Sequence, residues 1–204
     1  MNKRIALAFV LILSAATAWA GCAGPRVERI SPDRVTDISG RWNDTDSQQV
    51  ARAVVGDCLA QPWLDEWKRA NPDRRPVVIV GAIINKSHEH INVQTFMKDI
   101  ERALINSQKV RFVSSREERG ELRRERSDQH EGWTAEETRA GVGQEIGANF
   151  MMKGSLNTIV DELESSKAVF YQANIELHDL TTNEIVWLGE HKIKKIIDKD
   201  SVKW

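Results

Sequence analysis

Apolar side chains first recur at helical spacing within residues 47–61. Between Val50 and Leu59 they come in pairs that return every four residues, which places them on one buried stripe of a helix. Thr45 and Gln48 lie just before this stripe at the spacing of a capping box, in which the Thr45 hydroxyl accepts a hydrogen bond from the first turn. The pattern therefore predicts a capped helix over residues 47–61.

The next apolar segments alternate between helical and extended character. A short aromatic segment, 63–67, precedes a nearly unbroken β-branched run, 76–84, which is typical of a central strand buried on both faces. A polar loop follows over residues 85–91. Helical spacing then returns and predicts a helix over residues 93–106, and a short strand follows at 110–113.

Two more capping-box patterns occur in a very polar stretch. The pattern that begins at Ser115 predicts a polar helix ending near Arg126. The pattern that begins at Thr134 predicts a further helix ending near Ile146.

Three strands are predicted in the last part of the chain, over residues 150–161, 168–179 and 185–196. The tight turn at 180–184 joins the last two into a hairpin. Apolar and polar residues alternate along the middle strand, so one of its faces belongs to the core. Early helices and late antiparallel strands predict an α/β fold: a mixed four- to five-stranded sheet with flanking helices, ending in antiparallel strands.

The first residues have the pattern of an export signal. Lys3 and Arg4 supply positive charge, and the apolar run over residues 5–18 is shorter than a helix needs to span a bilayer. No other stretch approaches this hydrophobicity. We therefore expect the mature protein to have no membrane-spanning helix.

The end of this signal can be cleaved in two ways. Read as a lipobox, residues 19–22 direct lipidation of the Cys22 thiol, although Trp19 stands where Leu is usual. Read as a small-x-small site, residues 18–20 direct release of a soluble protein, with Cys22 free or paired to Cys58. We expect lipidation at Cys22, because a lone cysteine at this position has little other reason to be there. Each buried methylene of an acyl chain contributes ~0.8 kcal/mol, so two or three chains would anchor the protein permanently.

A chain of 204 residues suits one globular domain with short extensions. The segment before the first helix contains Gly and Pro and has no period, so it is interpreted as a tether. Ala23, rather than Asp, follows the cysteine, which favours the outer membrane. The expected parts are a lipoprotein signal peptide (1–21), a lipid-anchored flexible tether (22–44), a periplasmic domain (45–197) and a tail (198–204).

The charge of the mature chain argues against a nucleic-acid partner. Two of the 29 basic residues lie in the signal, which leaves 27 against 30 acidic residues and a net charge near −3. Nucleic-acid-binding proteins instead carry a basic patch that neutralises phosphates. Only two cysteines are present, too few for a disulfide framework.

Two segments could be taken for metal or carboxylate sites. His88 and His90 have ligand spacing, but no third donor is evident nearby, and a solvated loop is the preferred interpretation. The cluster from Asn43 to Asp46 precedes an amphipathic helix, so we interpret it as a helix cap rather than a cation or catalytic site.

Other titratable residues also favour structural roles. The arginines of Arg116 to Arg126 alternate with glutamates, so they can pair along the helix and form a solvated face rather than an anion site. His178 and His191 fall on the last hairpin and could titrate together, but ordinary sheet residues are expected. Cys58 lies on the buried stripe and is expected to be an inert thiol.

The motifs of common enzymes are missing from the sequence. It contains no Gly-rich phosphate loop, nucleophile elbow or CxxC pair. The sequence therefore predicts no catalytic residue, cofactor, metal site or small-molecule substrate.

Four segments together resemble the LpoB family of penicillin-binding protein activator lipoproteins, over about residues 38–197. They are Ser39 to Ser47, the strand Pro76 to Ile84 with Asn85-Lys86-Ser87, the helix Phe96 to Asn106 with Lys109 to Val113, and the turn Thr181 to Trp187. The turn is shared with TolB-like and curli-secretion lipoprotein domains of related architecture.

This resemblance implies an outer-membrane lipoprotein, without an active site of its own, that binds and stimulates a bifunctional peptidoglycan synthase. The family's lipidated cysteine corresponds to Cys22. The well-known members cross the periplasm on long Pro-rich linkers, whereas a tether of about 22 residues stretches to ~75 Å at most and averages ~25 Å as a coil. The short tether favours an alternative, a structural or secretion-related envelope lipoprotein that acts near the outer membrane.

Overall fold

The computed structural model describes residues 27–32 and 34–198. The chain divides into two units, of which the first ends at Arg34 and the second begins at Val35. The described residues of the first unit contain no helix or strand. None of the described helices is both long and apolar enough to cross a membrane. The elements below all belong to the second unit.

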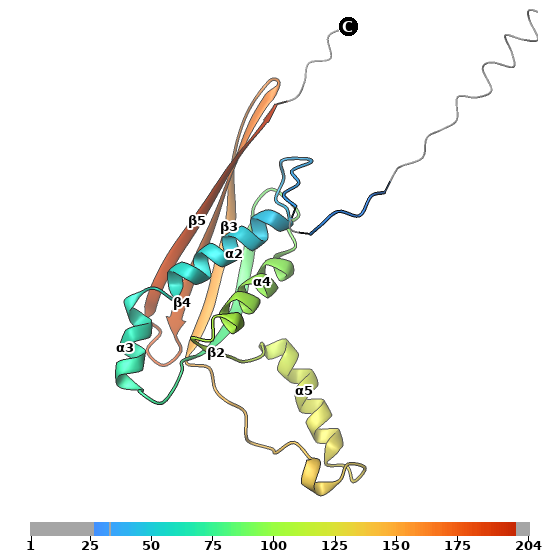
Figure 1. The fold of residues 1–204 in the computed structure, drawn as a ribbon, viewed down its shortest axis with the longest axis vertical. Helices are drawn as coiled ribbons and strands as arrows, with labels where there is room; N and C mark the ends of the chain where they lie inside the picture. The colour runs from blue at the N-terminus through green and yellow to red at the C-terminus, as the bar shows by residue number, and fades with distance from the viewer. Residues whose placement is uncertain (1–26, 33, 199–204) are drawn as a thin grey trace, which may run out of the picture. The chain divides into compact units, whose positions relative to one another are not determined.

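One mixed five-stranded sheet forms the base of the second unit (Figure 1). Its strands are β1 (Val77–Lys86), β2 (Arg111–Phe112), β3 (Phe150–Leu163), β4 (Ser166–Asp179) and β5 (Ile185–Asp198). They lie in the order β2-β1-β3-β4-β5. β1 runs parallel to both of its neighbours, whereas β3, β4 and β5 are successive antiparallel partners. The predicted mixed sheet that ends in antiparallel strands is confirmed.

In the described part of the chain the helices are α2 (Asp44–Cys58), α3 (Pro62–Ala70), α4 (Val93–Asn106) and α5 (Arg116–Gln129), and η2 (Glu136–Thr138) is a short 3-10 helix. α2 and α4 pack side by side on one face of the sheet (Figure 1), where α2 contacts β5 and α4 contacts β1 and β2. The aromatic segment after the first helix forms its own helix, α3. Proline lacks a backbone N–H, but Pro62 is tolerated at the first position of α3 because an N–H there would have no acceptor within the helix.

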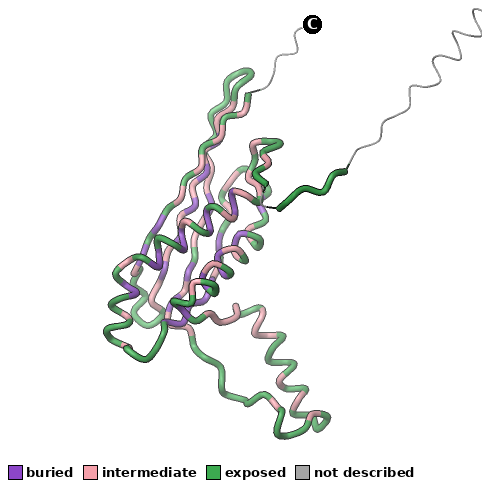
Figure 2. Tube along the Cα trace, viewed as in Figure 1, coloured by how far each residue is buried: buried purple, intermediate pink, exposed green. Residues whose placement is uncertain are grey.

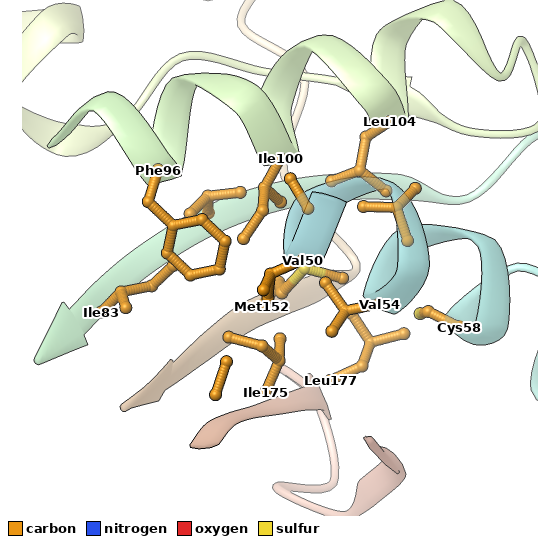
Figure 3. Packing of buried hydrophobic residues seen from close by; sticks show 14 of the residues in the cluster. Val50, Val54, Cys58, Ile83, Phe96, Ile100, Leu104, Met152, Ile175 and Leu177 are labelled. Atoms are coloured by element: carbon orange, nitrogen blue, oxygen red, sulfur yellow. The ribbon is translucent and has the colours of Figure 1, made fainter. Parts of the chain in front are cut away.

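The hydrophobic core fills the space between the sheet and the two helices, α2 and α4 (Figure 2). Phe96, Ile100 and Leu104 of α4 point toward Val50 and Val54 of α2 and toward the strands below them (Figure 3). All five side chains are at most 2% exposed. The apolar stripes read from the sequence are therefore the faces that the helices bury, and they account for the packing of the two layers.

β1 is buried on both faces only in its first half. Val77 to Val80 are all buried, as expected of a central strand. The register with β3 then shifts between Val80 and Ile83, and beyond it Ile83 is buried whereas Ile84 is 53% exposed. The prediction of two buried faces is therefore wrong for the second half, where the face opposite α2 and α4 is open to solvent.

The predicted helix from Thr134 to Ile146 is wrong. Only η2 forms there, without a side-chain cap, and the residues that follow are irregular. Gly143 has a positive φ of 74°, which a helix does not allow. None of the described residues from 134 to 146 is buried, so no packing offsets the cost of starting a short helix. The Ser115 prediction is confirmed: Ser115 and Glu118 form a capping box at the start of α5.

Candidate functional site

The N-cap of α2 lies two residues earlier in the chain than the sequence pattern predicted. Asn43 is the N-cap: its side-chain oxygen accepts the Asp46 N–H at 3.1 Å, and the Asp46 carboxylate accepts the Asn43 N–H at 3.0 Å. The prediction that Thr45 and Gln48 form the cap is therefore wrong, whereas the interpretation of the acidic cluster as a cap is confirmed. The pairs Thr45/Gln48 and Asn43/Asp46 both have the spacing of a capping box. Lys195 favours the Asn43/Asp46 box because it binds the Asp46 carboxylate.

Lys195 ties this segment to the last strand. Its Nζ lies 2.6 Å from a carboxylate oxygen of Asp46, 2.7 Å from one of Asp37 and 3.1 Å from the Arg41 carbonyl oxygen. The Lys195 side chain is 11% exposed and that of Asp46 is 7% exposed. Burial disfavours the charged ammonium, but the hydrogen bonds to Asp37 and Asp46 outweigh it and raise the pKa of Lys195.

A second set of contacts holds Trp42 on the core. The Glu89 carboxylate accepts the Trp42 backbone N–H at 3.1 Å and the Tyr171 hydroxyl at 2.8 Å. The Trp42 ring meets Tyr171 and Phe96 edge to face, with ring centres 5.6 and 6.0 Å away. Burial is the largest cause that raises the pKa of Tyr171, and the hydrogen bond to Glu89 raises it further. We call the whole set the Lys195–Glu89 network: Asp37, Trp42, Asn43, Asp46, Glu89, Tyr171 and Lys195.

The contacts of this network indicate a structural role rather than a catalytic one. Its three carboxylates, Asp37, Asp46 and Glu89, each accept hydrogen bonds from named donors, so none of them is an open acid, base or ligand. Within residues 27–32 and 34–198, no group of three or more His, Cys, Asp or Glu side chains is placed to bind a metal ion. The network therefore fixes the start of the domain onto β4, β5 and the loop before α4.

The histidines that the sequence suggested lie apart from one another. His88 and His90 are exposed on the loop after β1, on either side of Glu89. His178 contacts Glu176 at 2.7 Å, whereas His191 contacts Gln49 of α2. In the sheet register His178 is opposite Ile185 and His191 is opposite Ala173. The two sheet histidines are therefore not paired with each other in the sheet.

The arginines of α5 use a partner outside their own helix. Arg123 binds both carboxylate oxygens of Glu145, at 3.0 and 2.7 Å, and Arg126 binds the same carboxylate at 2.9 Å. The expectation that these charges pair along the helix is wrong for Arg123 and Arg126. The hydrogen bonds from Arg123 and Arg126 lower the pKa of Glu145 from 4.5 to about 2.

This pKa shift predicts an acid-sensitive contact. Because the pKa of Glu145 is lower in the folded chain than in the unfolded chain, the stabilisation is complete above about pH 4.5 and is lost as the pH falls toward 2. A carboxyl titration followed by NMR should place the Glu145 midpoint near 2. Amide protection in the last turn of α5 should fall over the same pH range. Glu145→Gln should abolish this change, whereas Glu131→Gln should leave it. A Glu145 midpoint near 4.5 would contradict the prediction.

The structure tests the prediction for Cys58 but not the prediction for Cys22. Cys58 is a free thiol, 1% exposed, and burial raises its pKa to about 12. The prediction of a buried thiol is confirmed, and such a thiol is a poor nucleophile because little thiolate is present at neutral pH. Cys22 lies outside the described residues, so its lipidation stays a prediction.

Sequence reasoning missed the residues that hold the network together. Lys195 belongs to a Lys-rich strand in which its neighbour Lys194 is exposed, and Glu89 lies between two exposed histidines. Neither residue has a local motif. The one available signal was alternation along β5, which places Lys195 on the same face as the buried Trp187.

One family model matches most of the chain. The family model of the peptidoglycan-synthase activator LpoB matches residues 46–193. Among solved structures, the C-terminal domain of LpoB from Escherichia coli is 18% identical, with a TM-score of 0.46, and the match covers 74% of this chain and 99% of that one. Lipoprotein GNA1162 from Neisseria meningitidis is 14% identical, with a TM-score of 0.38, and the match covers 62% of this chain and 88% of that one. A search of curated proteins found no match.

The family match covers well over half of the chain. It begins at Asp46, inside the Lys195–Glu89 network, and ends at Ile193 in β5, so it includes β1 to β4 and most of β5. This protein belongs to the family of the peptidoglycan-synthase activator LpoB.

Proposed function

We propose that this protein binds a bifunctional peptidoglycan synthase, a penicillin-binding protein, and stimulates its activity. The observation that carries the proposal is the match of the LpoB family model to residues 46–193, which covers β1 to β4, most of β5, most of α2 and all of α4. The protein acts as a regulator of cell-wall synthesis. It shifts its partner toward the active state by binding that state more tightly.

The geometry supports a binding role rather than catalysis. The described side chains with shifted pKa values form ion pairs or hydrogen bonds within the domain or, like Cys58, lie in the core. Catalytic sites instead leave shifted groups open to a substrate. The rigid sheet and its two helices therefore present surfaces to another protein.

The proposal includes a lipid anchor at Cys22 and a place on the periplasmic face of the outer membrane. The signal pattern of residues 1–21 and the small residues before Cys22 support it. From Cys22 to Asp37, where contacts with β5 begin, the chain reaches at most ~50 Å when fully extended. This short reach is the observation that favours the alternative, a structural or secretion-related role near the outer membrane.

Reconstitution separates the two roles. The Cys22→Ser protein is purified without lipid and added to each bifunctional synthase of its own cell in a glycan-polymerisation assay. We expect binding at micromolar concentrations or below and a higher polymerisation rate. Absence of binding to every synthase would reject the activator role and leave the alternative. In cells, Cys22→Ser should move the protein from the membrane fraction to the soluble periplasmic fraction, and unchanged fractionation would reject the anchor.

A further inference from the structure

A groove of about 680 Å³ lies where the corner between α2 and α3 meets the start of β5. Its apolar lining includes Pro62 and Trp63 from the corner and Ile185 and Leu188 from β5. The Trp187 indole crosses the gap and donates a hydrogen bond to Asp57 of α2 at 2.9 Å. The groove therefore has one wall made by helices and one wall made by a strand.

The strand wall is an open edge of the sheet. β5 is the outermost strand, so one side of its backbone has no strand partner in the described part of the chain. Its second half carries Lys192, Lys194 and Lys195, and lysines on an edge discourage pairing with other chains. The first five residues, Ile185 to Gly189, include no charged residue, and Ile185 and Leu188 are 53% and 65% exposed. The unprotected part of the edge is thus the part that lines the groove.

The rim of the groove is acidic and lacks a cation. Asp57, Glu66 and Glu184 line it, and no Lys or Arg does. Asp57 accepts hydrogen bonds only from the neutral side chains of Gln61 and Trp187, and Glu184 accepts one from the Thr182 hydroxyl. Within residues 27–32 and 34–198, none of the three carboxylates forms an ion pair. Their charge is therefore left for a partner to neutralise.

We propose that this groove binds an extended, basic segment of the synthase, which adds as a strand to the open edge at Ile185 to Gly189. Backbone hydrogen bonds to the edge supply affinity, and side chains at alternate positions supply specificity. Apolar side chains of the segment contact Ile185 and Leu188. Its Lys or Arg side chains pair with the acidic rim. This inference rests on the proposed function, because it assigns the surface through which the partner is held.

A second copy of this chain fits the groove less well. Trp187 and Asp57 lie on the helix-covered face, whereas the exposed Lys192 and Lys194 point to the opposite face, because side chains alternate along β5. When two sheets join edge to edge, each face continues across the joint. The exposed lysines of a second copy would therefore lie across the sheet from Asp57.

The test uses two pairs of variants and the purified synthase. Glu66→Lys/Glu184→Lys reverses the rim charge, and its control, Glu121→Lys/Glu131→Lys, makes the same charge change at exposed positions elsewhere. Leu188→Lys puts a charge on the open edge, and its control, Ile196→Lys, changes a residue of β5 that is 68% exposed, against 65% for Leu188. Circular dichroism and thermal unfolding establish that all four variants are folded.

We expect each groove variant to bind the synthase at least about tenfold more weakly than wild type, and each control to bind as wild type does. Binding of wild type should also weaken as salt is raised. If wild type binds and the groove variants bind equally well, the groove assignment is overturned while the activator role stands. If wild type binds no synthase, the activator role fails and the assignment fails with it. A wild-type dimer that Leu188→Lys dissociates would show a second copy on this edge and would also overturn the assignment.

Discussion

Replacing Lys195 with Met is expected to lower the free energy of unfolding by about 3 kcal/mol. The methionine keeps most of the volume of the lysine stem but removes the charge that faces Asp46 and Asp37. Asp46 is 7% exposed, so water cannot replace the lost cation, and a buried carboxylate is left without its counter-charge. Urea unfolding at neutral pH measures the change.

The neighbouring residue supplies the control. Lys194 is exposed and forms no ion pair in the part of the chain that the structure describes, so Lys194→Met should change stability by less than about 0.5 kcal/mol. Adding Asp46→Asn to Lys195→Met removes the unpaired charge and should recover part of the loss, as in a double-mutant cycle. Equal stabilities for the Lys194 and Lys195 variants would show that the ion pair contributes nothing.

Replacing Gly154 with Ala should destabilise the protein by about 2 to 3 kcal/mol. A Cβ at this position in β3 would lie 2.2 Å from the backbone oxygen of Asn174 and 2.7 Å from Cδ1 of Ile175. Gly154 pairs with Ile175 in the sheet, so the clash is with the neighbouring strand itself. A strand cannot move aside as a flexible side chain can, and the β3–β4 ladder must separate locally.

The same substitution at Gly56 should have the opposite sign. Gly56 lies within α2, and a Cβ there would meet nothing within 4 Å. Alanine restricts the unfolded chain and favours the helix, so Gly56→Ala should raise the free energy of unfolding by about 0.5 to 1 kcal/mol. Paired urea or thermal unfolding of the two variants provides the measurement. A destabilised Gly56→Ala, or a Gly154→Ala as stable as wild type, would contradict the packing described above.

Periodicity predicted the elements that bury a face. The stripes of α2 and α4 and the alternation in β4 were readable because burial on one side repeats at the period of the element. The Thr134 helix was predicted from a capping pattern alone. A cap lowers the cost of a helix end by about 1 kcal/mol, which is too little to stabilise a short helix that packs against nothing.

The candidate site was less readable than the fold. Asn43 and Asp46 were recognised as cap residues, because capping is decided within one turn. Lys195, which binds the Asp46 carboxylate, is 149 residues away from Asp46, and no local pattern connects the two. The sequence pattern also gives no sign of the role of Glu89, which lies between His88 and His90. Its carboxylate joins Trp42 to Tyr171.

The spacing of neighbouring residues was enough to predict the fold class, the core stripes, the buried Cys58 and the resemblance to LpoB. The three-dimensional arrangement was needed to find which capping residue is used, where Arg123 and Arg126 have their partner, and where an uncharged edge meets an acidic rim. These features depend on groups that the fold brings together from distant parts of the chain. Their energies arise from contact and burial, which spacing along the sequence does not specify.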